Sequence, residues 1–436
     1  MEWDKMLRTV VFVALVALAT SEKVTFEDYK VFRVIPSSEE QLDLLKHLEG
    51  LNEGITVERT KINPKKNRPP QFSFWAEPSR VFQPADVMVA PSQLDEFTKL
   101  MDASDILYET YVQDVQNLID NENPKTRSGS FGWTQYHTLE EIYAWLESLA
   151  KQYPGKVEVV NAGKTSQGRV IKGVKLSFGA NKPGVFIEGG IHAREWISPA
   201  TVTYLLNQFL TSKDLRVRKL AEAHDWYIFP NFNPDGYAHT HNTNRMWRKT
   251  LSKTPGSSCL GADANRNWDF QWMSGGASQN PCAETYAGAG AFSEPETKSM
   301  AAYIKSLSGK LFAYISFHSY SQLLLFPYGH TTKHLDNHDE SKAMGLKAIN
   351  ALSERYGTKY VTGNIAETIY IASGSSMDWV KANLKVPVSF TYELRDTGRH
   401  GFVLPADQIV PNGEEILDSF LAMFDEALKF GYPKKQ

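Results

Sequence analysis

Apolar and polar positions in the N-terminal part of the chain follow the spacings of short strands and helices. The segment Tyr29–Ile35 alternates apolar and polar side chains, as a half-buried strand does. In order, the predicted elements are a strand at Tyr29–Ile35, a helix opened at Ser37 and running to about Glu49, a strand at Val87–Val89, a helix opened by Pro91, and a strand at Ile106–Val112. This order predicts a small α+β unit.

From about residue 138 onward, short apolar runs alternate with helical stretches. Thr138 and Glu141 form a capping box for one helix, and we expect Ser198 to cap another that Pro199 begins. The predicted buried strands are Val185–Glu188, Trp226–Pro230, Phe312–Phe317 and Val386–Tyr392, and a last helix is predicted from Glu414 to Leu428. Such alternation is typical of an α/β domain with a mixed, largely parallel central sheet covered by helices.

The two units are separated by a polar segment, residues 121–130 (NENPKTRSGS). It has turn-forming residues, no apolar anchor, and two basic side chains, Lys125 and Arg127. We place the domain boundary here. An ordinary interdomain linker is the alternative interpretation of the same composition.

The first residues have the pattern of a secretory signal peptide. Lys5 and Arg8 precede an apolar run from Thr9 to Ala19, which is too short to span a bilayer. A buried strand is the alternative. An exported protein meets an oxidising compartment, so we expect the two cysteines, Cys259 and Cys282, to be joined rather than to remain free thiols.

Overall composition excludes several classes of protein. The chain of 436 residues is 42% hydrophobic and 22% charged, which is typical of a globular protein and not of a disordered or fibrous one. With 47 basic and 50 acidic side chains, the net charge of −3 gives no electrostatic reason to expect nucleic acid or an anionic membrane as a partner.

Polar residues that follow the predicted strands are the candidates for chemistry, because α/β sheets bind ligands beyond the carboxyl ends of their strands. His192 and Glu195 follow one strand, and His318 follows another. Imidazole and carboxylate are both zinc ligands, but a His-x-x-Glu spacing alone is weak evidence, since His137 and Glu140 share it at a helix start.

Two further segments concentrate polar side chains. Residues 263–269 (DANRNWD) can bind carboxylates and orient histidines, although a turn with internal hydrogen bonds would also explain them. Glu393 lies near the end of a strand too apolar to leave it solvated, so it is either paired or functional. The remaining histidine groups, at 239 and 241 and at 330, 334 and 338, are expected on the solvated surface.

Taken together, these segments resemble the secreted zinc metallocarboxypeptidases of the digestive carboxypeptidase A/B type, which are made as procarboxypeptidases. The resemblance runs through YKVFRV, HAREWISPA, NPDGY, TNRMWRK, DANRNWD, FHSYSQLLLFPYG, IYIASGSSMDW and FTYELRDTGRHGF, in that order. Several long matches in register are far more specific than any one motif.

The resemblance implies a role for each matching residue. His192, Glu195 and His318 would bind one zinc ion and leave a position for water. Glu393 would be the general base, and Arg248 would stabilise the oxyanion. The other implied roles are recognition of the substrate's free α-carboxylate by Asn265 and Arg266, closure over the substrate by Tyr370, and orientation of a ligand histidine by Asp263.

The specificity pocket is where this sequence departs from the residues common in the family. Met377 would lie at the pocket base, where an aspartate selects basic C-terminal residues and an apolar side chain selects aromatic or aliphatic ones. Asp378 would point away. Ile371 and Ser375 differ from the residues common in relatives, which puts the depth of the pocket in doubt but not the reaction.

The resemblance also implies an organisation: a signal peptide at 1–19, an activation prosegment at 20–127 and a zinc carboxypeptidase domain at 128–436. A trypsin-like protease would cut after Arg127, or after Lys125. The substrates would be peptides and proteins bound by their free C-termini, and the mature form would be a monomer secreted into a digestive lumen. The alternatives are a catalytically silent binding protein on the same fold, and an enzyme that removes acidic or amino-terminal residues, against which Asn265 and Arg266 argue.

Overall fold

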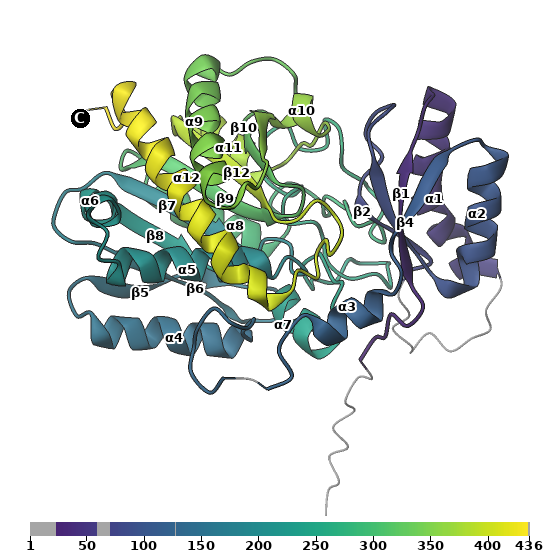
Figure 1. The fold of residues 1–436 in the computed structure, drawn as a ribbon, viewed down its shortest axis with the longest axis horizontal. Helices are drawn as coiled ribbons and strands as arrows, with labels where there is room; N and C mark the ends of the chain where they lie inside the picture. The colour runs from purple at the N-terminus through teal and green to yellow at the C-terminus, as the bar shows by residue number, and fades with distance from the viewer. Residues whose placement is uncertain (1–22, 59–69, 127, 435–436) are drawn as a thin grey trace, which may run out of the picture.

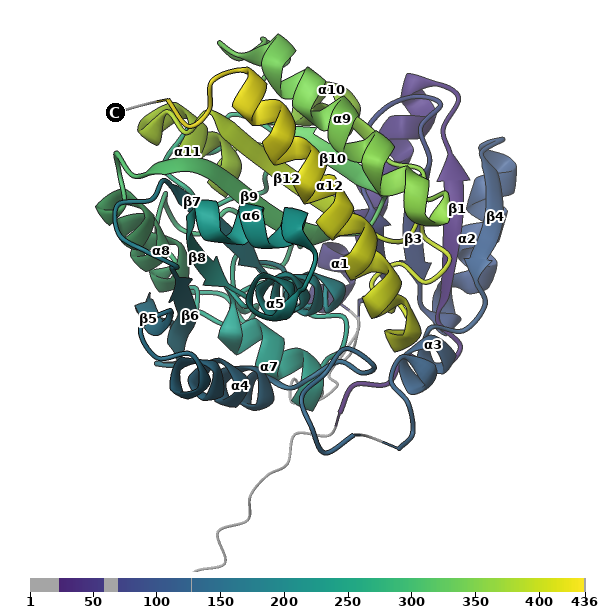
Figure 2. The same ribbon diagram turned by 60° about the vertical axis from the view of Figure 1, so that its left-hand side comes forward.

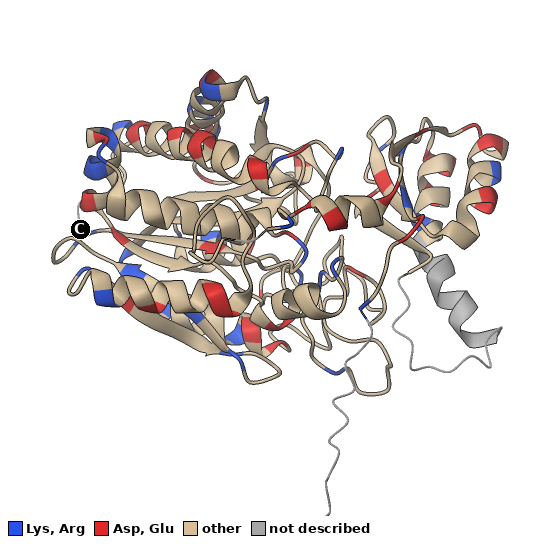
Figure 3. Ribbon diagram, turned by 60° about the horizontal axis from the view of Figure 1, so that its bottom comes forward, with Lys and Arg blue, Asp and Glu red and all other residues tan. Residues whose placement is uncertain are grey.

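The computed structural model describes residues 23–58, 70–126 and 128–434. The predicted signal peptide and Arg127 lie outside these residues. A smaller N-terminal unit lies beside a larger C-terminal unit (Figure 1). Acidic and basic residues occur in both units (Figure 3). Among the described helices, none combines the length and the apolar character needed to cross a bilayer.

The N-terminal unit is an antiparallel sheet with two helices on one face. Its described strands, in the spatial order β2-β3-β1-β4, are β1 (Lys30–Ile35), β2 (Phe72–Ala76), β3 (Ala85–Val89) and β4 (Leu107–Val112), and its helices are α1 (Glu39–Glu58), α2 (Leu94–Ala103) and α3 (Val115–Asn121). Along β1, Phe32 and Val34 pack under the helices while Val31 faces the C-terminal unit. The predicted α+β unit is confirmed; β2 and α3 were not predicted.

The C-terminal unit is built on a mixed sheet with a parallel centre. Its described strands, in the spatial order β11-β10-β12-β9-β7-β8-β6-β5, are β5 (Val157–Lys164), β6 (Val170–Leu176), β7 (Gly184–Gly189), β8 (Asp225–Phe229), β9 (Leu311–Ser319), β10 (Leu323–Phe326), β11 (Val361–Asn364) and β12 (Val388–Leu394). Strands β12, β9, β7 and β8 are parallel neighbours, whereas β5, β6 and β10 make antiparallel pairs. The predicted fold class is therefore confirmed.

Helices cover both faces of this sheet (Figure 2). They are α4 (Leu139–Gln152), α5 (Ile197–Thr211), α6 (Leu215–Ala223), α7 (Pro234–Asn242), α8 (Pro295–Ser306), α9 (His338–Tyr356), α10 (Ile365–Thr368), α11 (Ser376–Leu384) and α12 (Ile409–Lys429). Helices α4, α5, α9 and α12 share one apolar core with the sheet, and α8 and α11 share the core on the other face. The sheet is thus buried on both sides, as its near-continuous apolar strands predict.

Two local predictions have different outcomes at helix starts. The capping box of Thr138 and Glu141 is confirmed. The prediction for Ser198 is wrong, because α5 begins at Ile197 and the Ser198 hydroxyl makes tertiary contacts instead. It accepts a hydrogen bond from the Gly190 amide (2.9 Å) and donates one to the Phe317 carbonyl (2.6 Å), which ties the end of β7 to the end of β9.

The expectation that His239 and His241 are solvated is also wrong. Burial lowers the pKa of His239, and the His241 ring stacks on Trp196 with centroids 4.0 Å apart. Both lie on α7, where the neighbouring Thr240 hydroxyl accepts a 2.8 Å hydrogen bond from Trp196 Nε1. Of the second histidine group, His330 is half-buried and its Nδ1 lies 2.8 Å from an Asp378 carboxylate oxygen, whereas His334 is exposed.

Candidate active site

Three potential metal ligands meet at the carboxyl ends of β7 and β9. His192 and Glu195 lie in the loop between β7 and α5, and His318 lies on β9, opposite Glu393 of β12. The loop turns sharply at Gly190, whose φ of 65° is accessible to glycine without strain. At Gly189 a Cβ would lie 2.7 Å from the Ser198 hydroxyl, so only glycine fits there. Close packing of β7 against α5 therefore positions the loop.

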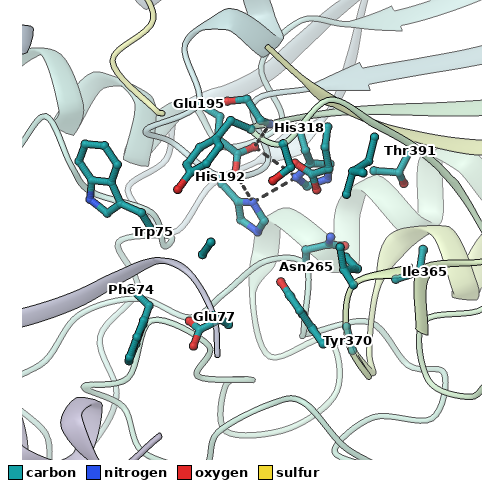
Figure 4. Close-up of a pocket in the computed structure, with 18 of the residues that line it drawn as sticks. Phe74, Trp75, Glu77, His192, Glu195, Asn265, His318, Ile365, Tyr370 and Thr391 are labelled. Atoms are coloured by element: carbon teal, nitrogen blue, oxygen red, sulfur yellow. Dashed lines mark hydrogen bonds and ion pairs between the residues drawn. The ribbon is translucent and has the colours of Figure 1, made fainter. Parts of the chain in front are cut away.

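The three side chains are buried and point at one another (Figure 4). His192 Nδ1 lies 2.8 Å from Glu195 Oε1 and 3.1 Å from His318 Nδ1. His318 Nδ1 is in turn 3.2 Å from Glu195 Oε2, which also accepts a 3.3 Å hydrogen bond from the Ser319 amide. Sequence positions up to 126 residues apart are thus brought within contact distance.

The donor set fits a divalent cation. His192 Nε2 lies 3.1 Å from Asp263 Oδ1, and because a carboxylate only accepts, Nε2 carries the proton and Nδ1 presents a lone pair. That lone pair faces a carboxylate oxygen and a second imidazole nitrogen, so a cation at their centre removes the repulsion between them. Two imidazoles and one carboxylate are a typical catalytic zinc set with an open fourth position.

Asp263 connects this set to Arg248. Arg248 donates to Asp263 Oδ2 through Nε (3.2 Å) and Nη2 (2.7 Å), and the Asn265 amide donates to Oδ1 (2.8 Å). Burial alone would raise the pKa of Asp263, but Arg248 and His192 hold it well below its usual value. Asp263 is therefore a permanent anion that fixes the His192 ring and the Arg248 guanidinium at once.

Arg266 and Tyr370 face each other across the next part of the site. The Arg266 side chain is buried and is held by hydrogen bonds from Nε to the Gly276 carbonyl (2.8 Å) and from Nη1 to the Asn265 carbonyl (3.0 Å). Its guanidinium carbon lies 5.9 Å from the centroid of the Tyr370 ring. Asn265 Oδ1 accepts a 3.1 Å hydrogen bond from the Ser376 amide, which links this segment to α11.

Glu393 has the electrostatics of a proton acceptor. Burial raises its pKa to about 8, against the opposing charge of His318. A divalent cation beside it would favour the ionised form, which is the form that a base requires.

A single cavity of about 190 Å³ joins these groups. Among the residues predicted from the sequence, its lining contains the following: His192, Glu195, Arg248, Asn265, Arg266, His318, Tyr370, Met377 and Glu393. Met377 is buried on α11. Asp378 is not in the lining; its carboxylate accepts hydrogen bonds from the Gly329 and His330 amides at 2.9 and 3.0 Å.

Further cavity residues were not singled out from the sequence. Arg194 and Tyr320 line it, although both belong to quoted segments, HAREWISPA and FHSYSQLLLFPYG, which were the available signal. Phe74, Trp75 and Glu77 of the N-terminal unit also line it (Figure 4), so β2 and the residues after it form part of the cavity wall. No pattern in the sequence indicated that contact.

The two cysteines are joined as expected. The Cys259–Cys282 disulfide has a Cα–Cα distance of 5.2 Å. It lies close in sequence to Glu284 and Thr285, which line the cavity. The bond therefore fastens one side of the cavity rim.

Comparison with known proteins agrees with this geometry. Residues 142–419 match the family described as zinc carboxypeptidase, and residues 61–122 match the carboxypeptidase activation peptide. The chain is 47% identical to zinc carboxypeptidase A 1 of Anopheles gambiae over 436 residues, covering 99% of this chain and 96% of that protein. It is 38% identical to human carboxypeptidase A1, covering 98% and 100% of the two chains.

A solved structure gives the same result for the fold. The crystal structure of carboxypeptidase A from Helicoverpa armigera superposes with a TM-score of 0.80 at 26% identity, covering 94% of this chain and 99% of that one. The converging His-Glu-His set, the family matches and the relatives' near-complete coverage lead to one conclusion. The chain belongs to the zinc carboxypeptidase family and carries that family's activation peptide ahead of its catalytic region.

Proposed function

We propose that this zinc carboxypeptidase removes single C-terminal residues with aromatic or aliphatic side chains from peptides and proteins. One observation carries the proposal: a single cavity presents the zinc-ligand set and Glu393 together with Arg266 and the apolar Met377. A metal centre, an anion-binding group and an apolar pocket are the three features that such a reaction needs in one place.

The position of Arg266 supports recognition of a free C-terminus. Its guanidinium is buried at the cavity wall, where hydrogen bonds to two backbone carbonyls fix its plane, and the Asp263 carboxylate is no nearer than 4.0 Å. A planar, pre-oriented guanidinium suits a carboxylate, which it can bind through two parallel hydrogen bonds. Asn265 adds an amide group beside it, and Tyr370 closes over the bound residue.

Met377 supports the preference for apolar side chains. Moving a Phe or Leu side chain from water to an apolar pocket gains roughly 2 to 3 kcal/mol, whereas burying a Lys or Arg head group without a counter-charge costs several. The adjacent Asp378 cannot supply that counter-charge, because its carboxylate is occupied by the Gly329 and His330 amides outside the cavity. The flexible methionine side chain admits varied apolar shapes.

The chemical roles follow from the same geometry. Zinc bound by His192, Glu195 and His318 supplies polarisation of the scissile carbonyl and acidification of water. Glu393 accepts the proton of the attacking water and delivers it to the leaving amine nitrogen. Arg248 offers a fixed guanidinium to the negative charge that develops on the carbonyl oxygen, and Asp263 keeps both Arg248 and His192 in position.

The precursor form is explained by the activation peptide, which occupies the cavity mouth. Besides the contacts of β2, Asp86 of β3 accepts hydrogen bonds from Tyr320 of the catalytic region (2.8 Å) and from Arg33 of β1 (2.6 Å). We infer that cleavage after Arg127, or after Lys125, by a trypsin-like protease releases this cover. Lys125 and Thr126 are exposed, as such cleavage requires. The proposal includes export by the predicted signal peptide, a digestive lumen as the site of action, and a monomeric mature enzyme.

The test compares two substrates that differ only at their C-terminus. A blocked peptide ending in Phe is supplied as the free acid and as the amide to the trypsin-treated protein, and released amino acid is quantified by chromatography. We expect free Phe from the acid and at most traces of phenylalaninamide from the amide. Equal turnover of the amide, or cleavage of internal bonds, would refute the exopeptidase assignment, and tight binding without turnover would indicate a silent binding protein.

A further inference from the structure

A second group of potential metal ligands lies outside the catalytic cavity. His334 precedes α9, His338 is the first residue of α9, and Glu367 lies on α10. Each offers one ligand atom, and these three atoms lie within 4.8 Å of one another. His334 Nε2 is 3.4 Å from Glu367 Oε1, and the two imidazole rings are stacked with centroids 3.7 Å apart. Two imidazoles and a carboxylate form the same donor set as the catalytic site.

The local contacts prepare these groups for a cation. His338 Nδ1 lies 3.1 Å from Asp339 Oδ1, and a histidine that donates one ring N–H to a carboxylate presents its other nitrogen as a ligand. The His334 side chain is 55% exposed, which leaves its ring room to rotate toward a shared ion.

The position of Glu367 gives such an ion a structural consequence. In the precursor, Arg80 of the activation peptide donates hydrogen bonds to the backbone carbonyls of Ala366 and Glu367, the latter at 2.6 Å. These contacts hold α10, and they are lost when the activation peptide leaves. A metal ion bound by Glu367 and the two histidines would hold α10 from the side of the catalytic region itself.

We propose that His334, His338 and Glu367 form a second, surface site for a divalent transition-metal ion of the zinc class, which fastens α10 to the start of α9. Zinc and copper ions suit two imidazoles and a carboxylate, whereas magnesium and calcium prefer sites built from oxygen ligands alone. The site is independent of the catalytic chemistry, because none of its three residues lines the catalytic cavity.

The experiment is a metal titration of the full-length precursor. Protein carrying one equivalent of zinc is titrated with zinc chloride by isothermal calorimetry, and bound metal is counted after equilibrium dialysis. We expect a second equivalent to bind. His334→Ala and Glu367→Gln should each weaken that equivalent about tenfold or more, the range seen when metal-site groups are altered. His47→Ala, which removes an exposed imidazole of α1, is the matched control and should bind as the wild type does.

Two further measurements separate this site from the catalytic one. His192→Ala should lose the first equivalent and keep the second. Excess zinc should slow amide hydrogen exchange at residues 365–369 in the wild type but not in His334→Ala. The proposal is overturned if the wild type binds one equivalent only, or if His334→Ala and Glu367→Gln titrate like the wild type. Either result is independent of peptidase activity, so it leaves the proposed function standing.

Discussion

The buried ion pair between Glu122 and Arg245 offers a direct test of how the activation peptide is held. Glu122 follows α3, and Arg245 belongs to the catalytic region; both are almost fully buried. Arg245 donates to the Glu122 carboxylate through Nε (2.8 Å) and Nη2 (2.5 Å), and also to the backbone carbonyls of Arg194 and Phe402. Glu122 supplies the carboxylate that faces this guanidinium.

Removing one partner of a buried pair leaves the other charge uncompensated, at a typical cost of about 3 to 5 kcal/mol. In the Glu122→Ala precursor this cost falls on the docked state, in which the activation peptide lies against the catalytic region. When the activation peptide moves away, water can reach Arg245 and the cost disappears. At 1.4 kcal/mol for each factor of ten, a cost of about 3 kcal/mol raises the undocked population roughly 100-fold. With cleavage after Arg127 or Lys125, as proposed above, Glu122 would leave with the activation peptide, so the activated enzyme should be unchanged.

The assay measures peptidase activity of the uncut precursor relative to the activated enzyme, with Lys125→Gln and Arg127→Gln present to prevent cleavage. We expect Glu122→Ala to raise the precursor's residual activity roughly 100-fold, in line with the shift in docking. Glu96→Ala, at an exposed position of α2, is the matched control and should have no effect. Unchanged residual activity of the uncut Glu122→Ala precursor would refute the reasoning. A Glu122→Ala precursor without the two cleavage-blocking changes can be activated, and altered activity of that activated enzyme would also refute it.

Three other predictions test separate parts of the account. Glu393→Gln should keep one zinc by atomic absorption but lose 10²- to 10⁴-fold or more in kcat, and near-normal turnover would reassign the base. Met377→Asp should raise kcat/KM for peptides ending in Lys relative to Phe, and an unmoved ratio would contradict the pocket assignment. Burial raises the pKa of Glu296 to about 7 from an ordinary 4.5, so the stability this group contributes is lost as pH rises between these values. In urea unfolding, Glu296→Gln should therefore raise the free energy of unfolding by up to about 3 kcal/mol at pH 8 and by little at pH 4.5. An equal rise at the two pH values would exclude titration of Glu296 as the cause of the stabilisation.

Local patterns in the sequence were enough to predict the strands that bury either one face or both faces. Alternation along β1 and continuous apolar runs for β7, β8, β9 and β12 were sufficient, because those strands lie in cores. Strand β2 was missed because the sequence just before it, residues 63–70 (NPKKNRPP), is polar and proline-rich and obscured its short pattern. Helix α3 was missed because its seven residues run directly into the polar segment at residues 121–130, which was interpreted as the domain boundary.

The site depended on contacts that no local pattern contains. Asp263 and His192 are 71 residues apart in sequence, and their hydrogen bond exists only because the loop after β7 packs against the long segment between α7 and α8. The role of Ser198 was mistaken for the same reason, since a hydroxyl at a helix start has both local and tertiary partners available. The ligand set came from the resemblance to a family, whereas spacing alone could not separate His192 and Glu195 from the chance match at His137 and Glu140. Those last two residues lie at the start of α4, where His137 Nδ1 is 3.1 Å from a Glu141 carboxylate oxygen.

The central claim is that zinc-dependent catalysis and an apolar specificity pocket belong to one cavity. The most direct measurement is kcat/KM of the trypsin-activated protein on peptides that differ only in a C-terminal Phe or Lys, before and after removal of zinc by a chelator. The account predicts that Phe is released roughly 100-fold faster or more, from a difference of at least about 3 kcal/mol in pocket binding, and that zinc removal abolishes release until zinc is restored. Equal rates for Phe and Lys, or undiminished release by the metal-free protein, would contradict it.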